Sequence, residues 1–498
     1  GWDYKLSNRN TLSLMQSVNI GTRNSTEDQT FVSEDAAHST TSSGSQYNTN
    51  NTKYTNLTSR VGFKRTTTKP GKEWSTDLTF NLGARTSPAT TAQMDQGIDS
   101  DVPTFNSLQN RDSKGDDQDW TWQADVVDPY ADNRKIEWGF KSDYGLSTSR
   151  MDVTNSNDTV LIPVHDALLS NAYRIQTIVN AAYFNWSTKL SPRWSMQSGL
   201  RVEQNTMNSK RTDTGVSFDY NYPNGWDDLG HILFPAVYLS RKWDAPDGEL
   251  QRELQVNVSR KINRPRFYQI MPFIMATDAR SYRIGNPLLR PEMSTIVEVN
   301  HLLPFGEKGN WLSSVYGRVT SDVITSYTAP LESDPNILVT TFVNGQQNQG
   351  FGWENTVKLT LWPGSEVTLN GNVQWVEIGL TQNGVTYTNT GINFDGKANI
   401  SQKMPKGFSL QVNGDYDGPS IIPQGLTLER YSMDVTLRKE FSKRFFLTAS
   451  ANNIFDSRGW GSYYATPSFE QEGFRSWGGR EFRLSATWRF GKQDVSLF

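Results

Sequence analysis

The sequence predicts an all-β protein, in which residues 1–498 form one large antiparallel up-and-down transmembrane β-barrel. Three observations support this fold class. Apolar and polar residues alternate along segments of about 9–11 residues. Short connections between these segments alternate with long polar ones. Only 35% of the residues are hydrophobic, yet 12% are aromatic, with 16 tryptophans. A soluble domain is normally about 45–50% apolar.

The alternation is clearest in the last segment, EFRLSATWRF, residues 481–490. Every second side chain is apolar, as expected of a strand with one oily face. A slip of one residue would place Arg483 and Arg489 in hydrocarbon, at a cost of about 2–4 kcal/mol each near the bilayer centre. The predicted lipid-facing residues are therefore Phe482, Leu484, Ala486, Trp488 and Phe490.

The same alternation recurs along the chain. Many of its aromatic residues lie near the predicted strand ends, where they would form the aromatic belts of a membrane protein. A soluble β-sandwich or propeller also alternates, but that fold does not explain the alternating lengths of the connections. Further examples of the pattern are residues 136–146, 194–203, 367–375, 408–416 and 431–437.

The connections predict the orientation and the size of the barrel. Short turns such as 68–73 and 363–366 would face the periplasm, and long polar loops would face the outside. The count is about 19 strands here. The first segment, residues 1–6, reaches a short turn early, and bacterial barrels normally have an even strand number, so we expect about 22 strands in the complete protein. The predicted long loops are 23–52, 88–116, 151–171, 204–228, 264–292, 326–341 and 456–478.

Two stretches carry a family resemblance. SRKINRPRFYQIMPF (259–273) and YRIGNPLLRPEMSTIVEVN (282–300) resemble the C-terminal outer-membrane barrel of TonB-dependent receptors, and NNIFDSR (452–458) is similar to the same family. The resemblance implies a bacterial outer-membrane transporter that binds a substrate at its extracellular mouth. It also implies a plug domain, which is not visible in this chain, and through it a TonB-type energy-transducing complex. Outer-membrane lipid and the barrel-assembly machinery are the other implied partners.

A second function stays open beside transport. The chain could be a transporter-derived or plugless barrel that serves as a structural, docking subunit of a larger outer-membrane complex. Its partners would then include a surface lipoprotein or other outer-membrane subunits. An upstream plug domain would favour transport, and stable co-purifying proteins would favour the docking subunit.

Aromatic residues and arginines in two of the predicted long loops are candidates for substrate binding. Alternatively, the Asn263–Pro265 and Gly285–Pro287 stretches fix turns, and the rings pack their loop on its neighbours. The second loop could equally be a docking face. The candidates are Arg264, Arg266, Phe267, Tyr268, Arg280, Tyr282 and Arg283 in the first loop, and Trp460, Tyr463, Tyr464 and Trp477 in the second.

The sequence offers little for catalysis. No nucleophile elbow or phosphate-binding motif occurs in a suitable context, so we expect no enzyme and no cofactor. The four histidines lack metal-ligand spacing, and the acidic stretch 112–120 lacks the spacing of a calcium loop, so no metal site is predicted. The net charge of −3 argues against nucleic-acid binding, and the absence of cysteine excludes a disulfide framework.

Overall fold

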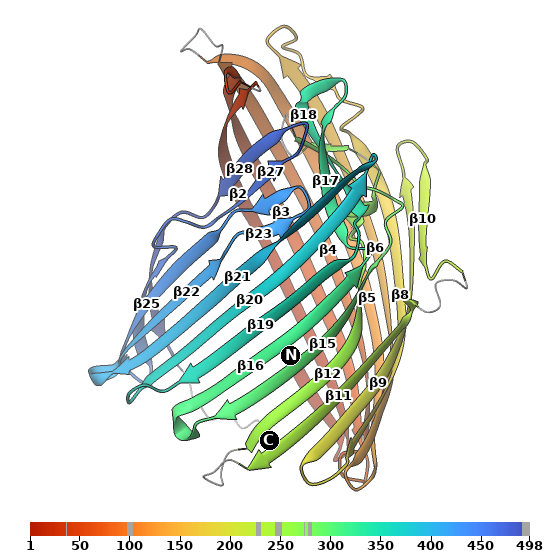
Figure 1. Cartoon of the computed structure of the whole chain (residues 1–498), viewed down its shortest axis with the longest axis vertical. Helices are drawn as coiled ribbons and strands as arrows, with labels where there is room; N and C mark the ends of the chain where they lie inside the picture. Colours follow the sequence, from red (N-terminus) through yellow and green to blue (C-terminus); the bar gives the residue numbers. More distant parts are fainter. Residues whose placement is uncertain are drawn as a thin grey trace.

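A computed structural model describes residues 1–35, 37–96, 103–225, 231–244, 251–272, 274–276 and 281–490. Among these residues, 21 strands form one antiparallel sheet in which each strand pairs with its neighbours in the chain. The sheet curves so that its early strands lie behind its later ones (Figure 1). Two members, β7 (Val164–His165) and β10 (Ser217–Tyr222), are short additions. The other 19 form the wall, which confirms the predicted strand number.

Each wall strand is hydrogen-bonded to the next in an up-and-down order. The wall consists of β1 (Trp2–Ser7), β2 (Asn10–Glu34), β3 (Thr40–Thr66), β4 (Glu73–Gln96), β5 (Thr104–Ala131), β6 (Arg134–Asn157), β8 (Asn171–Lys189), β9 (Trp194–Arg211), β11 (Leu233–Asp244), β12 (Gln251–Asn263), β15 (Glu292–Pro304), β16 (Gly309–Ser321), β19 (Asn348–Leu359), β20 (Ser365–Gln382), β21 (Val385–Met404), β22 (Phe408–Asp417), β25 (Arg430–Ser442), β26 (Phe445–Asn452) and β29 (Glu481–Trp488).

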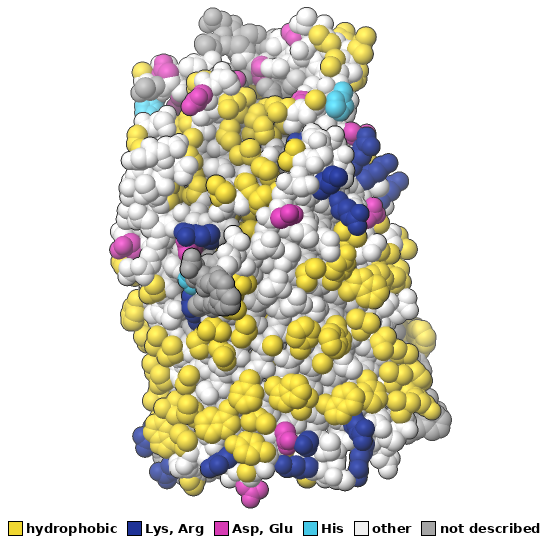
Figure 2. All heavy atoms as spheres, turned by 90° about the vertical axis from the view of Figure 1, so that its right-hand side faces the viewer, with side chains coloured by type: hydrophobic (Ala, Val, Ile, Leu, Met, Phe, Trp, Pro, Cys, Tyr) yellow, Lys and Arg dark blue, Asp and Glu magenta, His cyan; other side chains and the backbone are white. Residues whose placement is uncertain are grey.

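The outer face of the wall is apolar because the strand registers align the apolar sets. Val299 lies directly opposite Val256 on one side and Val315 on the other, and Val315 lies opposite Trp353. All four side chains are exposed in the isolated chain. Figure 2 shows the result on one side of the molecule: hydrophobic side chains form a band over the lower half, with lysines and arginines along its lower border.

The inner face is polar and hydrogen-bonded across strands. Tyr316 donates to Asn372 at 3.1 Å, and Asn372 donates to Asp395 at 2.9 Å. Nearer β1, Arg60 pairs with Asp77 at 2.9 Å. No helix in the described part of the chain is long and apolar enough to cross a bilayer.

Strands β2–β6 are much longer than a bilayer requires. They contain 24–28 residues, whereas about 9–11 suffice to span. On β2 the outward side chains are mostly apolar up to Ile20 and polar from Thr22 to Thr30. The prediction that 23–52 and 88–116 are loops was therefore wrong, because their polarity belongs to strands that continue beyond the apolar band.

The wall leaves short turns at one end and longer excursions at the other. The short turns include the 3₁₀ segments η2 (Gly306–Lys308) and η3 (Pro405–Gly407). The long-loop end carries two additional four-stranded sheets and one short helix. These elements are α1 (Phe267–Ile270), β13 (Ile274–Ala276), β14 (Ser281–Ile284), β17 (Ile324–Leu331), β18 (Asp334–Asn344), β23 (Ser420–Ile422), β24 (Gly425–Thr427), β27 (Gly459–Ala465) and β28 (Glu470–Ser476).

The first and last wall strands are both edges in the described part of the chain: β1 pairs with β2, and β29 pairs with β26. Both faces of β29 are accordingly exposed, and Phe482, Leu484, Ala486 and Trp488 share one of them. The strand ends at Trp488, so Phe490 lies two residues beyond it.

Candidate functional site

The described residues of the 264–292 segment (264–272, 274–276 and 281–292) fold back onto the inner face of the wall at the long-loop end. In α1, Ile270 is buried, as is Met271 directly after it. These two side chains form an apolar cluster with Ile175 of β8, Met207 of β9 and Phe342 of β18. Because the segment carries its own apolar anchor, its position is fixed by packing as well as by its turns.

The GNPLLRP stretch, residues 285–291, is a hub of backbone hydrogen bonds. Gly285 is buried and donates to Met271 O at 2.9 Å, and a Cβ at this glycine would clash with the Met271 backbone. Leu289 is 1% exposed. Asn344 accepts from Arg290 N at 2.7 Å and donates to the carbonyl oxygens of Arg290 and Asp322, at 2.9 and 2.7 Å. These contacts explain why the stretch needs a glycine, a buried leucine and ordered turns.

The two halves of the family motif meet in space. Asn263, at the end of β12, donates to the Glu292 carboxylate at 2.5 Å, and the other Glu292 oxygen accepts from Ile324 N at 2.6 Å. The Glu292 carboxylate therefore links the end of the 264–292 segment to Asn263, just before the segment, and to the start of β17.

The predicted arginines in this segment have different environments. Arg264 forms an ion pair with Glu203, which also pairs with Arg201, on the inner face of β9. Arg266 is exposed. Arg283 stacks over the rings of Tyr268 and Phe342, with its guanidinium carbon 5.9 Å from each ring centre. Arg280 lies outside the described residues.

The aromatic candidates of the segment are packed. Phe267 and Tyr268 lie against the apolar cluster, with Phe267 contacting Tyr173 at 4.8 Å between ring centres and Tyr268 contacting Phe342 edge-on at 5.6 Å. Tyr282 lies on β14, opposite Val339 of β18. A ligand at this mouth would therefore meet Arg266 directly, whereas Phe267 and Tyr268 support the surface from below.

The second predicted cluster lies on the β27–β28 hairpin. Trp460 is 48% exposed, Phe474 58% and Trp477 50%. Tyr463 and Tyr464 are partly buried, and Tyr463 donates to Glu470 at 2.5 Å, which raises the pKa of Tyr463. The hairpin thus presents exposed aromatic side chains at the long-loop end.

Asn453 anchors the base of this hairpin and belongs to the NNIFDSR motif. It is 1% exposed and has a φ of +51°, a backbone conformation that asparagine tolerates better than most residues. Its side chain accepts from Ser457 N at 3.1 Å and Arg458 N at 3.3 Å. Arg458 in turn forms two hydrogen bonds to Asp434 of β25, at 3.0 and 2.9 Å.

Sequence reasoning missed several partners of the candidate residues. Glu203 lies on a strand predicted only for its alternation, whereas Phe342 and Asn344 lie on β18, most of which falls in the stretch 326–341 that was predicted as a long loop. All three residues are distant from residues 264–292 in the chain, so no local pattern indicated the contact. A charged residue on a polar strand face gives no local signal of its partner. The single available signal was Asn344, which lies beside a glycine at a strand end, as turn residues do.

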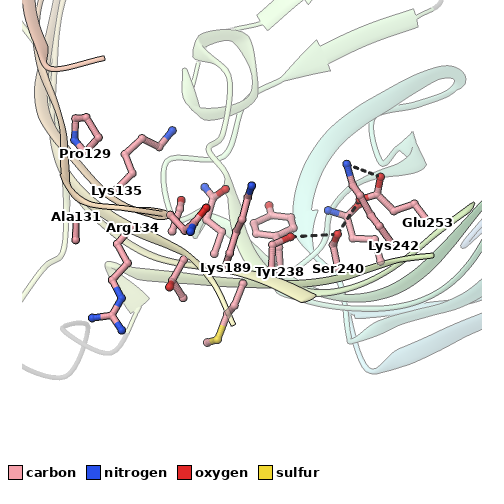
Figure 3. Close-up of a pocket in the computed structure, with 16 residues that line it drawn as sticks. Pro129, Ala131, Arg134, Lys135, Lys189, Tyr238, Ser240, Lys242 and Glu253 are labelled. Atoms are coloured by element: carbon pink, nitrogen blue, oxygen red, sulfur yellow. Dashed lines mark hydrogen bonds and ion pairs between the residues drawn. The ribbon is translucent and has the colours of Figure 1, made fainter. Parts of the chain in front are cut away.

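A cavity of about 460 Å³, lined by both polar and apolar side chains, lies at the short-turn end, on β5, β6, β8, β9, β11 and β12. Figure 3 shows Lys189, Tyr238 and Ser240 along it. Ser240 donates to Glu253 at 2.8 Å, and Lys242 lies 3.5 Å from the same carboxylate. Its lining combines charged side chains with Pro129, Met196 and Tyr238, and we assign it no role in substrate capture. Across the described ranges, no cluster of three or more metal-ligating side chains occurs.

An apolar outer face, a polar inner face and long excursions at one end of the wall define a large outer-membrane barrel. The chain belongs to the outer membrane protein beta-barrel family, whose sequence pattern matches residues 65–488. No protein in the curated set of sequences matches. The sequence resemblance and the predicted location in the bacterial outer membrane are thereby confirmed. The short turns accordingly face the periplasm, and the long-loop end is extracellular.

Solved structures show the same fold at low sequence identity. The ferric yersiniabactin uptake receptor FyuA from Yersinia pestis matches with a TM-score of 0.53 and 12% identity, over 98% of this chain and 77% of that one. The copper transporter OprC matches at 0.54 and 11%, over 96% and 80%. The ferric-catecholate import receptor Fiu from K12 E. coli matches at 0.51 and 10%, over 97% and 80%. These similar structures are named as receptors and transporters, and at this level of identity they show that the fold is shared.

Proposed function

We propose that this chain is the barrel of a TonB-dependent uptake receptor, which binds a substrate at its extracellular mouth and passes it through its lumen. The observation that carries the proposal is the folded segment 264–292, which is anchored on the inner wall by Ile270 and Met271. It carries Arg266, which is exposed, and Arg283, which is stacked on the rings of Tyr268 and Phe342. The chemistry is binding and passage, with no bond made or broken.

The substrate would contact residues on both extracellular clusters. Arg266 and Arg283 offer planar guanidinium groups that suit carboxylate or other anionic oxygen atoms. Trp460 and Trp477 offer exposed rings for stacking or cation–π contact. The similar structures are named for ferric yersiniabactin, copper and ferric catecholate, so ferric chelates are the first class to test.

Energy for passage would come from a TonB-type complex acting through a plug domain encoded upstream. The barrel-assembly machinery would insert the wall by way of the C-terminal strand, with its alternating apolar residues up to Phe490. Both partners belong to the proposal.

Tryptophan fluorescence of the full-length purified receptor tests substrate capture, with ferric citrate, a ferric catecholate and cupric ion as the probes. We expect one probe to quench the emission saturably, and Trp460→Phe to remove part of that quenching. Arg283→Ala should weaken binding by about tenfold, because a charge-assisted contact contributes about 1.5–3 kcal/mol. Trp138→Phe, on the lipid face, is the matched control. Quenching by none of the probes would reject this substrate class.

The exposed rings of Trp460, Phe474 and Trp477 favour a second candidate function. Exposed aromatic side chains on an extracellular hairpin, with Trp460 and Phe474 on its opposite faces, also suit a docking subunit that holds a surface lipoprotein or another outer-membrane protein. The two functions are separated by purification from the native membrane. A stoichiometric partner that is lost on Trp460→Ala, together with no ligand binding, would support docking. A ligand-binding protein without a partner would support uptake.

A further inference from the structure

We propose that the periplasmic end of the outer face binds the phosphate of an anionic phospholipid. The site lies on β9, β11, β12 and β15, on the lipid side of the wall and away from the lumen. It consists of Arg241 and Arg252, held among the rings of Trp194, Trp243 and His301. This proposal requires only that the wall spans the outer membrane, and it does not depend on what the receptor transports.

The strand registers place these side chains together on one face. Trp194, Arg241, Leu254 and His301 form a single row across the four strands. In the next row toward the turn, Trp243 lies directly opposite Arg252. Cross-strand neighbours of this kind have Cβ atoms about 4.5–5.5 Å apart. The two guanidinium groups therefore share one small area of the surface.

The rings hold Arg241 in a defined position. Its guanidinium carbon lies 5.4 Å from the centre of the Trp194 ring and 5.4 Å from the centre of the Trp243 ring. Trp243 in turn stacks on His301, with ring centres 6.3 Å apart and planes at 17°. Such cation–π contacts orient a guanidinium without neutralising it. Its hydrogen-bond donors stay available.

Within the described residues, neither Arg241 nor Arg252 forms an ion pair with a carboxylate, and Nε of Arg252 is buried without an acceptor. The nearby Glu253 points to the lumen, where it contacts Lys242 and Ser240. A charged group at the edge of a hydrocarbon layer needs a counter-charge, because its desolvation is costly. Phosphate is the counter-charge that the headgroup layer supplies.

The depth of the site fits the headgroup layer. Trp194 and Trp243 flank short turns, where interfacial tryptophans are found at the level of lipid headgroups. Figure 2 shows basic side chains along the lower border of the apolar band on one side of the molecule. Arginine binds phosphate oxygens through two parallel N–H donors, which gives geometric as well as electrostatic preference.

The same arrangement occurs a second time along the periplasmic border. Lys439 of β25 lies 4.3 Å from the centre of the Phe408 ring and 5.5 Å from that of Phe441. Its Nζ donates to the carbonyl oxygen of Lys406 in the adjoining turn. A cation held on rings thus recurs at the same depth on a distant part of the wall. The Arg241–Arg252 site is the stronger of the two, because it brings two guanidinium groups together.

Native mass spectrometry of the intact receptor tests this site, with phosphatidylglycerol and phosphatidylcholine of equal chain length as probes. We expect the receptor to retain phosphatidylglycerol preferentially. Arg241→Gln and Arg252→Gln should each reduce that retention by about fivefold, since each basic residue near an anionic lipid surface contributes about that factor. The matched control is Lys242→Gln, which removes a cation at the same depth from the lumen face.

The outcomes separate the lipid from other sources of binding. The site is supported if preferential retention of phosphatidylglycerol falls in both arginine-to-glutamine variants. The same retention should be kept in Lys242→Gln and in Arg241→Lys. Equal retention of the two lipids by the native receptor overturns it, as does unchanged retention in both arginine variants. Displacement of the lipid by inorganic phosphate alone would assign the arginines to a free anion and also overturn the lipid assignment. Heat-modifiable electrophoretic migration verifies that each variant is folded.

Discussion

Arg475 and Glu27 form a two-point ion pair although 448 residues separate them in the chain. Nε of Arg475 lies 2.5 Å from one Glu27 carboxylate oxygen, and Nη2 lies 2.8 Å from the other. The pair joins β28, near the last wall strand, to β2, near the first (Figure 1). It therefore connects the two ends of the sheet on the extracellular side.

Reversing one charge of this pair should loosen that connection. Arg475→Glu is expected to destabilise the extracellular end by about 1 kcal/mol or less, because both side chains are partly exposed. Hydrogen exchange of peptides from β28 should then increase. The double variant Glu27→Arg/Arg475→Glu should restore protection. An equal increase in the single and the double variant would show that the ion pair does not hold β28.

A second prediction concerns the lipid face of the wall. Val256→Arg places a charge in hydrocarbon and should cost about 2–4 kcal/mol near the bilayer centre, and less near its surfaces. Gln255→Arg introduces the same side chain into the polar lumen and should cost much less. Urea unfolding in lipid vesicles measures the difference in the free energy of unfolding. Equal costs would contradict the assigned register of β12.

The hydrogen-bond hub at Asn344 yields a third prediction. Asn344→Ala removes three hydrogen bonds that hold residues 290 and 322, and unsatisfied buried groups cost about 1–3 kcal/mol each. The extracellular segment should become susceptible to trypsin at Arg283, which precedes Ile284, since the Arg290–Pro291 bond itself resists trypsin. Asn344→Asp keeps the acceptor for Arg290 N and loses both donors, so its effect should be intermediate. Unchanged resistance of Asn344→Ala would show that the apolar cluster alone fixes the segment.

The buried leucine of the same stretch provides an independent test of that packing. Leu289→Ala should destabilise the inserted segment by about 2–5 kcal/mol, since the side chain is 1% exposed and its loss leaves a cavity. Leu288→Ala, at the exposed neighbouring position, should have little effect. Limited proteolysis of the two variants compares them. Similar cleavage rates would reject the burial of Leu289.

A fifth prediction concerns pH at the periplasmic end. A hydrogen bond from Lys72 at 2.7 Å, with Lys69 close by, holds the pKa of Asp128 below its ordinary value. Because the folded pKa is lowered, the stabilisation is present above the unfolded value of about 3.9 and is lost as the pH falls through the folded value. Hydrogen exchange of the turn at residues 66–73 should therefore increase in acid.

Asp128→Asn is the control for this pH effect. It removes the titrating group, so the turn should show the faster exchange already at neutral pH, with no further change on acidification. A pH dependence that persists in Asp128→Asn would assign the effect to another carboxylate.

The strands could be predicted because their pattern is local. Each apolar position, such as Val256 or Leu484, is fixed by its immediate neighbours and by the cost of a slipped register. The extent of β2–β6 was missed because polar strand and polar loop have the same composition between residues 23 and 52. Whether these residues form a strand or a loop depends on their cross-strand partners. Asn24, for example, lies opposite Asn51, which is 27 residues away in the chain.

The candidate site was harder to predict than the wall. The GNPLLRP stretch was identified from its turn residues, but its contacts with Asn344 and Asp322 come from other strands. The rings of Phe267 and Tyr268 were compatible with binding and with packing, and the structure places them against the apolar cluster. An arginine's partner, such as Glu203 for Arg264, depends on sheet curvature that no short stretch encodes.

The length of β2–β6 gives the extracellular rim an uneven height. A strand of 25 residues is about 80 Å long, whereas β26 and β29 contain 8 residues each. The long strands form a tall side, and the short strands at the other end of the sheet are extended mainly by the β27–β28 hairpin, which contacts β2 through the Arg475–Glu27 pair. A large ligand would therefore reach the lumen most easily from the side of these short strands, where Trp460 and Trp477 lie.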